Sequence, residues 1–407
     1  MILYLFRLFL IKLLITIFAR PNIIQLKSLF LFSILLFCSW CHAQTTIDFD
    51  EHTSNQLYTK LYGQIDYNQK IESGKRNAGL LDVHRVVVLF GYQFNRNTQF
   101  VSEIEIEHVK ELFIEQAYVK HRIAKGINLK TGLLIIPMGL VNETHEPTFF
   151  YSVERPLLDK NIIPSTWREI GLGISGIIQK QNLKYQFYLV NNPISYNNGP
   201  RINAASGIRS ARQKAAESII TSWPGITGQI EYFGIENTKI GLSTFYGKTN
   251  TSLYNTLEQI DEASNALIDS STLKISLTTI NATFNKKRYT ARGQYSLLAF
   301  GDTAPFNQLT NSDVPQLMHG FYVLLAYDLL KNDIESFSPF VRFSHINQQL
   351  KLSSGQTKNR ELSKNIITLG INYKPHPGVV FKADYQIFKI NSGQNYQQFN
   401  TGVGVWF

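Results

Sequence analysis

Apolar and polar residues alternate along most of this chain, from Leu57 to the last residue. The clearest example is 398–407, where one parity is mainly apolar and consists of Phe399, Thr401, Val403, Val405 and Phe407. Successive side chains of a strand point to opposite faces of a sheet, so this period of two predicts strands with one apolar and one polar face. About sixteen such segments follow one another, each near the ~10 residues that cross an outer membrane as a tilted strand. Their approximate bounds are 57–67, 83–94, 98–108, 112–123, 127–136, 169–180, 183–191, 225–234, 238–248, 272–284, 286–299, 317–328, 337–346, 364–374, 378–390 and 396–407.

The connections between these segments fall into two classes that alternate along the chain. Every second connection is short, and most contain Asn, Gly or Pro: 95–97, 124–126, 181–182, 235–237, the turn at Asn285, 329–336 and 375–377. The others are mostly long: 68–82, 137–168, 192–224, 249–271, 300–316 and 347–363, with shorter ones at 109–111 and 391–395. A transmembrane barrel has short periplasmic turns and longer external loops, whereas a soluble sandwich has no reason to sort its loops in this way.

We therefore predict an all-β fold, a closed antiparallel transmembrane barrel of about 16 strands. Closure removes the two unpaired edges that so large a sheet would expose. With an even strand count, both termini lie on the periplasmic side. The fourth and fifth strands, 112–123 and 127–136, are the weak places: the two parities from Leu112 to Val119 do not separate by polarity, so the sequence leaves the inward face there open.

Composition agrees with a barrel without requiring one. Mean hydropathy is −0.11, aromatic content is high with 27 Phe and 20 Tyr, and charged residues make up only 17%. A strand that exposes only every second residue to lipid gives this composition. A soluble all-β protein can have the same composition. The terminal Phe407 matches the aromatic C-terminus expected of exported outer-membrane barrels, which predicts that the last strand is read by the barrel-assembly machinery.

The N-terminal region has the order of a secretory signal. The apolar run 29–40 follows Arg20 and Lys27 and precedes Cys41-His42-Ala43, which predicts cleavage before Gln44. A second apolar block at 2–18 indicates a long signal or a later start, and an uncleaved anchor is the alternative. We therefore divide the chain into 1–43 signal peptide, 44–56 short periplasmic segment and 57–407 barrel. Both cysteines lie in the signal, and its removal leaves 36 basic against 30 acidic residues (+6), too small an excess to indicate nucleic acid.

The connection 137–168 has an unusual composition for an external loop. It contains four prolines, the aromatic run Phe149-Phe150-Tyr151, and charged residues that include Glu143, Glu146 and Arg155. Loops displayed to solvent rarely contain so many apolar residues. We expect this third extracellular loop to fold into the barrel and narrow the channel. A loop that clasps a neighbouring subunit, or packs on the rim, is the alternative.

The same region resembles a known family. The segments 132–139 (GLLIIPMG), 142–147 (NETHEP), 153–156 (VERP), 163–169 (IPSTWRE) and 171–173 (GLG), with 115–118 (EQAY), resemble the phosphate-selective porins O and P and their relatives in Bacteroidota-type bacteria. The resemblance is specific over roughly 100–176. It implies a 16-stranded, homotrimeric diffusion pore. The ladder of pore-lining Arg and Lys expected of phosphate selectivity is not evident in this chain.

Charged residues on inward parities are the candidate pore lining. Glu103, Glu105 and Glu107 share one parity, and carboxylates facing lipid near the midplane would cost roughly 2–4 kcal/mol each, so we expect them in the lumen. Bases cluster later in the chain and, in a barrel of about sixteen strands, on the opposite wall, which predicts a transverse field that discriminates by charge; solvated charges without such a role are the alternative. The candidate pore and constriction residues are Glu103, Glu105, Glu107, Glu143, Glu146, Arg155, Arg168, Arg288, Arg292, Arg342, Lys374, Lys382 and Lys60.

The sequence does not support nucleotide binding, metal binding or catalysis by the other motifs. Gly171-Leu-Gly173-Ile-Ser-Gly176 matches the dinucleotide pattern but alternates as a strand, so small residues that leave room for the infolded loop explain it better. The nine histidines have no metal-ligand spacing, and no nucleophile motif is present. Loop 192–224 contains Arg201, Arg209, Arg212 and Lys214, which could draw anions, bind lipopolysaccharide phosphates or keep the loop soluble.

Together these features predict an outer-membrane porin for passive diffusion of small hydrophilic solutes or ions, including anions such as phosphate. We expect no catalytic residue, no metal and no cofactor. The expected partners are membrane lipid and lipopolysaccharide. A non-conducting structural or adhesive barrel is the alternative, and a lipase-type enzyme in the wall is disfavoured.

Overall fold

The computed structural model describes residues 55–257 and 261–407, which belong to a unit that extends from Gln44 to Phe407. The predicted signal peptide, 1–43, and most of the predicted 44–56 segment lie outside the described residues. Among the described residues, no helix is both long and apolar enough to cross a membrane.

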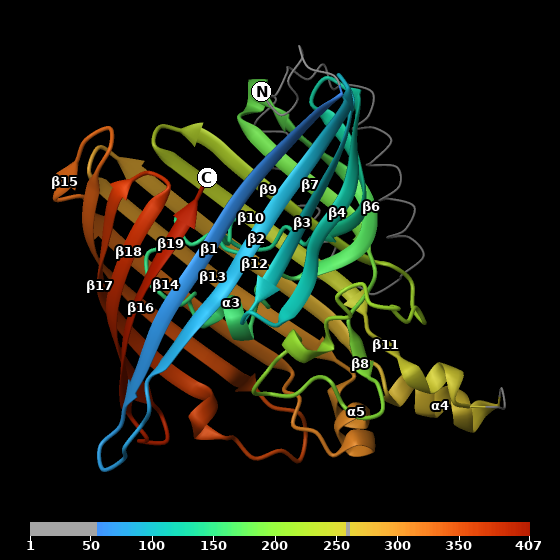
Figure 1. The fold of residues 1–407 in the computed structure, drawn as a ribbon. Coiled ribbons are helices and arrows are strands. Elements are labelled where there is room, and N and C mark those ends of the chain that lie inside the picture. The colour runs from blue at the N-terminus through green and yellow to red at the C-terminus, as the bar shows by residue number, and fades with distance from the viewer. Residues whose placement is uncertain (1–54, 258–260) are drawn as a thin grey trace, which may run out of the picture. The chain divides into compact units, whose positions relative to one another are not determined.

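Sixteen long strands of the described chain form one closed antiparallel sheet, and each pairs with its neighbours in sequence (Figure 1). The ring closes where β1 pairs with β19, with Tyr62 opposite Trp406. The predicted fold class and strand number are therefore confirmed. The strands are β1 (Gln56–Ile71), β2 (Leu80–Asn95), β3 (Thr98–Glu107), β4 (Glu111–Ala124), β5 (Ile127–Ile135), β6 (Arg168–Ile178), β7 (Leu183–Val190), β9 (Gly225–Ile235), β10 (Thr238–Lys248), β12 (Lys274–Lys286), β13 (Tyr289–Gly301), β14 (Leu317–Tyr327), β16 (Ser336–Lys351), β17 (Ser363–His376), β18 (Val379–Ile390) and β19 (Tyr396–Trp406).

The remaining elements lie in the connections. The short strands are β8 (Ile194–Tyr196) and β11 (Asn250–Thr251), which pair in parallel, and β15 (Leu330–Lys331), which pairs with β16. The helices are α3 (Leu158–Asn161), α4 (Glu262–Ser270) and α5 (Thr303–Thr310). The described residues also form four 3-10 turns: η1 (Gln179–Gln181), η2 (Arg209–Ala211), η3 (Ser252–Asn255) and η4 (Arg360–Leu362).

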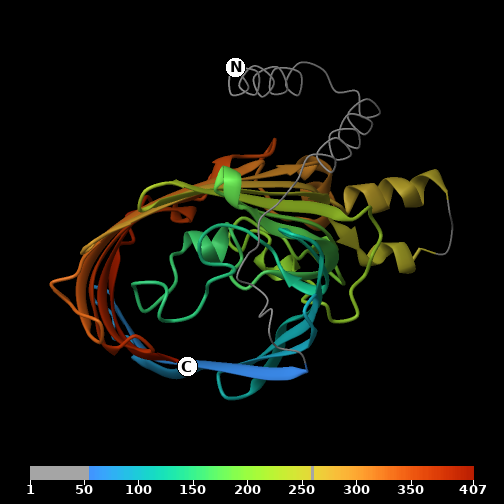
Figure 2. The ribbon, with the colours of Figure 1, turned by 90° about the horizontal axis from the view of Figure 1, so that it is seen from above.

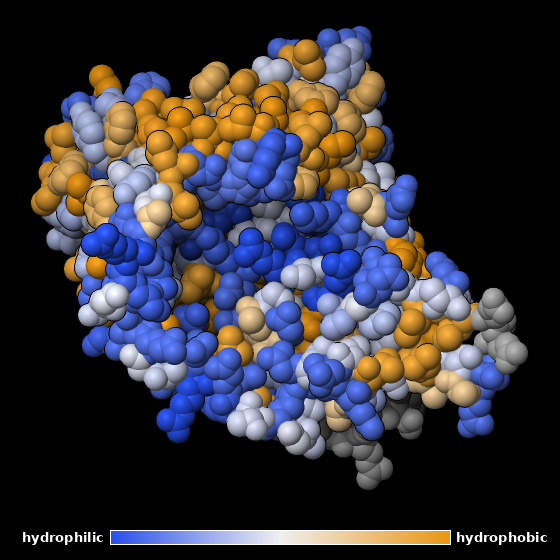
Figure 3. Space-filling view, turned by 60° about the horizontal axis from the view of Figure 1, so that its bottom comes forward, coloured by the Kyte–Doolittle hydropathy of each residue, from blue (hydrophilic) through white to orange (hydrophobic). Residues whose placement is uncertain are grey.

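The two faces of the sheet differ as the alternation predicts. Outward side chains are apolar and exposed, for example Leu172 at 52% and Leu325 at 54%. They form a band over the outer wall in Figure 3, which also shows hydrophilic residues lining the hollow inside. Inward side chains such as Gln64, Gln294 and Asn400 are polar and buried. This pattern suits a barrel with lipid outside and water within.

The connection between β5 and β6, residues 136–167, is called loop 3 here, and that between β7 and β9, residues 191–224, is called loop 4. Loop 3 lies inside the ring of strands (Figure 2). Its apolar residues Ile136, Met138, Ile163 and Trp167 form a buried core with wall residues such as Phe245 and with Ile202 and Ile208 of loop 4. The expected infolding of the third long loop is confirmed, and burial of its apolar side chains explains it.

A β-bulge in β4 resolves the strand whose inward face the sequence left open. Glu103 pairs with Gln116, but the next residue, Ile104, pairs with Ile114, so Glu115 is the extra residue. A bulge switches the parity of the strand beyond it and can redirect a side chain. Glu115 is thereby fully buried among lumen residues.

The small residues of β6 have a different role from the one expected. A side chain on Gly171 would meet Val190, and one on Gly173 would meet the ring of Tyr188. These glycines therefore make room for β7, their partner strand, and not for loop 3. Glycines on other strands make room for loop 3: on the last strand Gly404 faces Pro147 and Gly402 faces Val153, and on β14 Gly320 faces Leu158.

Candidate functional site: the lumen and its infolded loop

Asn142 ties the two ends of loop 3 together. Its Nδ2 donates to the carbonyls of Ile136 at 2.7 Å and Trp167 at 3.1 Å, and its Oδ1 accepts from the Trp167 amide at 2.8 Å. One buried side chain thus closes the neck of a loop of about thirty residues, whose ends the wall already holds side by side.

A second anchor joins the middle of loop 3 to the bulge on β4. His145 Nε2 lies 3.0 Å from Glu115 Oε2, and Nδ1 lies 3.1 Å from the carbonyl oxygen of Asn142. Burial alone would lower the pKa of His145, but the carboxylates of Glu115 and Glu103 outweigh burial and raise it. The ring faces acceptors at both nitrogens, which favours the doubly protonated form.

The bases predicted on the far wall hold the loop backbone instead of lining free water. Lys374 Nζ donates to the carbonyl of Thr148, Arg292 to that of Phe149, and Lys382 to those of Phe150 and Ser152. Arg342 donates to the hydroxyl of Ser152, and Asp384 accepts from the Val153 amide. We call this set the basic clamp: Arg292, Arg342, Lys374 and Lys382. Carbonyls brought into the barrel need donors, and Arg292, Lys374 and Lys382 supply them, while Arg342 holds the Ser152 side chain.

The predicted acids lie where the sequence placed them, on the inner face of β3. Glu103 and Glu105 are buried, and Glu107 is half-buried. Glu103 accepts from Gln116 Nε2 at 2.6 Å, and Glu105 Oε1 lies 3.7 Å from Arg85 Nη1. Arg85 on β2 was not among the candidates, although its inward parity could have indicated it.

Two cavities lie beside loop 3. The larger of them, about 850 Å³, lies between the β1–β4 wall and loops 3 and 4. The smaller, about 310 Å³, lies between residues 148–151 and the wall from β13 to β17. The larger cavity therefore has the acidic wall on one side and loop residues on the other.

Basic residues of loops 3 and 4, together with Arg168 at the start of β6, face the acids across the larger cavity. They are Arg155, Lys160, Arg168, Arg209, Arg212 and Lys214. Burial and the nearby Arg168 and Arg209 lower the pKa of Arg212 to about 10, and burial and Arg85 lower that of Arg155 to about 10. The Nε atoms of Arg155 and Arg168 are buried without a hydrogen-bond partner. We call these six residues the basic loop face. The expected transverse field thus has its acids on the predicted wall but most of its bases on the loops, because the far-wall bases Arg292, Lys374 and Lys382 are bonded to the loop backbone.

The other predicted residues lie apart from this cavity. Glu143 accepts two bonds from Gln186 Nε2, each 2.8 Å, and the side chain of Glu146 is half-buried. Arg288 lies in the turn after β12, is exposed, and donates to the carbonyls of Asp328 and Leu329, so it caps a turn instead of lining the pore. Lys60 is exposed near the closing seam, 5.6 Å from the ring centre of Trp406.

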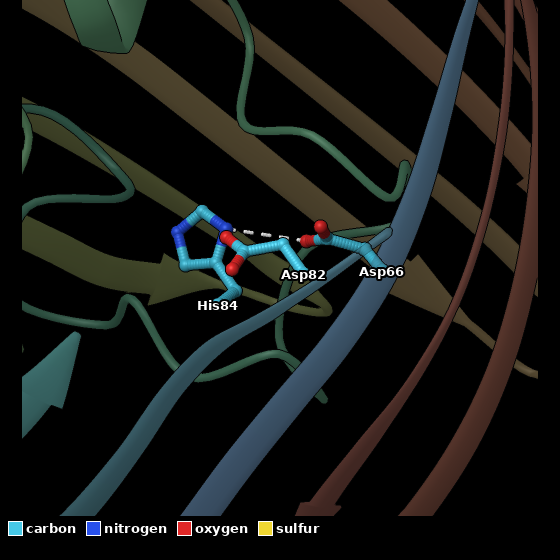
Figure 4. Close-up of side chains that lie close together, drawn as sticks. All are labelled: Asp66, Asp82 and His84. Atoms are coloured by element: carbon cyan, nitrogen blue, oxygen red, sulfur yellow. Dashed lines mark ion pairs between the residues drawn. The ribbon is translucent and has the colours of Figure 1, made fainter. Parts of the chain in front are cut away.

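The fold also assembles a cluster that the sequence did not indicate. Asp66 on β1 and Asp82 and His84 on β2 point toward one another at the edge of the larger cavity (Figure 4). His108, from the β3–β4 turn, lies 2.5 Å from Asp82 (Nδ1 to Oδ2). Asp66 and His108 are distant in sequence from Asp82 and His84, and the strand register brings the four residues together.

Comparison with known proteins places this fold among porins. No family model matches the chain. An uncharacterized protein of Aquifex aeolicus (strain VF5) is 31% identical over 334 residues, 80% of this chain and 74% of that protein. The OmpF structure of Salmonella typhi in complex with daunomycin is 10% identical, with a TM-score of 0.56 over 87% of this chain and 98% of that chain. The channel DcaP of Acinetobacter baumannii and an anion-selective porin from Comamonas acidovorans are each 11% identical with a TM-score of 0.55; they cover 90% and 86% of this chain and 100% of their own. At these identities the solved structures share the fold.

Proposed function

The chain belongs to the same family as the uncharacterized protein of Aquifex aeolicus, and we propose that it is an outer-membrane porin through which small hydrophilic solutes or ions diffuse passively. One observation carries the proposal: a closed sixteen-stranded barrel, apolar outside, retains a polar cavity of about 850 Å³ beside its infolded loop. Barrels of 16–18 strands are wide enough for an aqueous channel. No catalytic step is part of the proposal.

The charge arrangement supports a finer proposal about selectivity. The acids of β1–β4 and the basic loop face oppose each other across the larger cavity, so a polar solute that enters is aligned by the field between them. The guanidinium groups of Arg155 and Arg168, which line this cavity, offer hydrogen-bond donors to an anion. We therefore propose that small anions travel along the basic loop face, and that inorganic phosphate is the first to test, as the resemblance to phosphate-selective porins suggests.

Changing the charges tests whether the acidic wall or the basic loop face determines the ion selectivity of the pore. Replacing Glu103, Glu105 and Glu107 by Lys removes the acidic side, so the reversal potential in a salt gradient should shift toward anions. Arg155→Gln with Arg212→Gln should shift it toward cations. If both triple and double variants keep the wild-type ion preference, the field has no selective role.

Passage of solutes is tested by liposome swelling. Proteoliposomes should swell in neutral sugars at rates that fall steeply with sugar size, because loop 3 narrows the lumen. Swelling no faster than in protein-free liposomes would favour the non-conducting barrel.

Location and assembly belong to the same proposal. A cleaved N-terminal signal, periplasmic termini and assembly through the strand that ends at Phe407 would give an outer-membrane protein in contact with lipid and lipopolysaccharide. A homotrimer is the proposed state, because a trimer form is among the solved neighbours: OmpT, an outer membrane protein of Vibrio cholerae, which has a TM-score of 0.52. Light scattering of the detergent-extracted protein distinguishes a trimer from a monomer.

A further inference from the structure

A β-bulge at the rim of the larger cavity brings two acids face to face. Gln64 pairs with Arg85, but two residues later Asp66 pairs with Asp82, so β2 has one extra residue between these pairs. The bulge switches the parity of β2, so that Arg85 and Asp82 both line the cavity. Like charges directly opposite one another across two strands are destabilising, so positive charge beside Asp66 and Asp82 would stabilise this pair.

Two histidines supply ligand nitrogens beside these acids. His84 Nδ1 lies 3.2 Å from Asp66 Oδ2, and ligand atoms of Asp66, Asp82 and His84 all lie within 4.8 Å of one another (Figure 4). The His84 and His108 rings are 5.6 Å apart between centroids. Four ligands at ~2.1 Å around a tetrahedral ion are roughly 3.4 Å apart, a spacing not far from that of Asp66, Asp82 and His84, and His108 lies against Asp82.

Glu107 on β3 lies within reach of both rings. Its Oε1 is 4.0 Å from His84 Nε2 and 3.8 Å from His108 Nε2. Strands β1, β2 and β3 and the β3–β4 turn therefore direct two imidazoles and three carboxylates toward one another.

The backbone of His108 is held in an unfavourable conformation that directs it to this place. His108 and Val109 form the β3–β4 turn with φ of 53° and 63°. Such turns favour Asn-Gly, and a β-branched residue at positive φ is an outlier. Outliers of this kind cluster at binding sites, where surrounding structure maintains them.

The side-chain amides of Gln64 and Asn68 orient the Asp66 carboxylate, and the amide oxygen of Asn68 has no hydrogen-bond partner of its own. Gln64 Nε2 donates to Asp66 Oδ2 at 2.9 Å, and Asn68 Nδ2 lies 3.4 Å from Asp66 Oδ1. The Asn68 Oδ1 atom is buried without a hydrogen-bond partner. Partners behind the ligands fix their orientation in metal sites, and a metal-bound water is a donor that such an acceptor could use.

We propose that this rim cluster binds a divalent transition-metal ion of the Zn²⁺ class, with Asp66, Asp82, His84 and His108 as ligands and Glu107 next to them. Two imidazoles with carboxylates suit zinc and its neighbours in the first transition row, whereas Ca²⁺ and Mg²⁺ prefer oxygen ligands alone. Bound metal places positive charge between Asp66 and Asp82 and joins β1, β2 and the β3–β4 turn at the entrance to the cavity.

Equilibrium dialysis of the tag-free full chain in detergent against ZnCl₂ tests the proposal, with Cys38 and Cys41 alkylated so that thiols do not bind the ion. We expect one Zn²⁺ per chain, and at least ~10-fold weaker binding in both His84→Ala/His108→Ala and Asp82→Asn. The matched control is His319→Ala/His345→Ala, which removes another pair of adjacent rings, 5.3 Å apart, from β14 and β16 and should leave binding unchanged.

The readout is binding and not current, so it does not depend on whether the barrel conducts. Heat-modifiable gel migration of each variant confirms that the barrel has folded. The proposal is overturned if His84→Ala/His108→Ala binds Zn²⁺ as tightly as the wild type, or if equimolar Ca²⁺ displaces Zn²⁺. The second result would indicate an acidic cluster without histidine ligands.

Discussion

His145 bonds to Glu115 across the lumen, with Nε2 and Oε2 3.0 Å apart, and both residues are buried. This contact joins the middle of loop 3 to the β4 bulge on the acidic wall, whereas the basic clamp holds residues 148–153 on the opposite wall. Loop 3 is thus suspended between two walls of opposite charge, and it does not rest on one side alone.

Replacing His145 by Ala should release the loop from the acidic wall. Removing one partner of a buried ion pair typically costs about 3–5 kcal/mol, because the other charge stays buried and unpaired. We expect a lower urea midpoint of unfolding and noisier open-channel current. The control is His145→Gln with Glu115→Gln, which replaces both charges and should recover most of the stability.

The same contact predicts a pH dependence. The pKa of His145 is raised in the folded protein, so its stabilisation is fully present below the unfolded value and is lost as pH rises through the folded value. Wild-type current noise should therefore increase on the alkaline side. Noise in the doubly neutral His145→Gln/Glu115→Gln variant should not change with pH; an equal rise in that variant would exclude His145 as the group responsible.

Lys382→Met should free the loop from the basic clamp. The change removes the donors to the carbonyls of Phe150 and Ser152, and each carbonyl left unsatisfied costs about 1–3 kcal/mol. Single-channel conductance should increase, because loop 3 can move away from its position across the lumen. Lys389→Met, on the same strand but exposed, is the matched control, and an equal conductance in the two variants would contradict the clamp.

Gly404→Ala tests the packing of loop 3 against the last strand. A Cβ there would lie 2.5 Å from Pro147 Cβ, so the loop must move. Overpacking of this kind typically destabilises by about 1–3 kcal/mol. At Gly63 on the neighbouring strand a Cβ meets only ordinary contacts of 3.5 Å or more, so Gly63→Ala should leave the midpoint unchanged. Equal midpoints for the two variants would show that Pro147 does not pack there.

Asp159 of α3 predicts a second pH dependence of stability. It comes from a buried acid, whereas the first comes from a buried base. Burial raises the pKa of Asp159 to about 7, against opposing contributions from the Gln294 hydrogen bond and nearby Arg342 and Arg155. The folded protein therefore binds a proton that the unfolded chain has released, and stability falls between about pH 4 and pH 7. At ~1.4 kcal/mol per pKa unit the loss is on the order of 2–4 kcal/mol. Asp159→Asn should remove this fall, as measured by unfolding midpoints at pH 5 and pH 8; an unchanged pH slope would contradict it.

The strands were predictable because alternation and turn chemistry are local. The predicted segment 238–248 coincides with β10, and most other bounds differ by only a few residues. Alternation failed at 112–123 because the bulged Glu115 breaks the period of two, which no propensity reveals. The infolding of loop 3 was predictable from its apolar composition, since such residues need a surface on which to pack.

The site was predictable only in part. Glu103 and Glu105 lie in the lumen because parity is a property of one strand. The role of Lys382 depends on where a loop more than two hundred residues away places its carbonyls, and the cluster at His84 depends on a bulge and on the register of three strands. Both the role of Lys382 and the His84 cluster depend on contacts between residues that are distant in the chain, and a single sequence does not reveal such contacts.

Single-channel recording in a planar bilayer tests the central claim, that the lumen beside loop 3 is a continuous water-filled path. Purified protein should give ohmic current steps whose conductance rises in proportion to KCl concentration, and the steps should be larger in Lys382→Met. Correctly folded barrel that gives no steps, or steps that do not scale with salt, would contradict a diffusion pore.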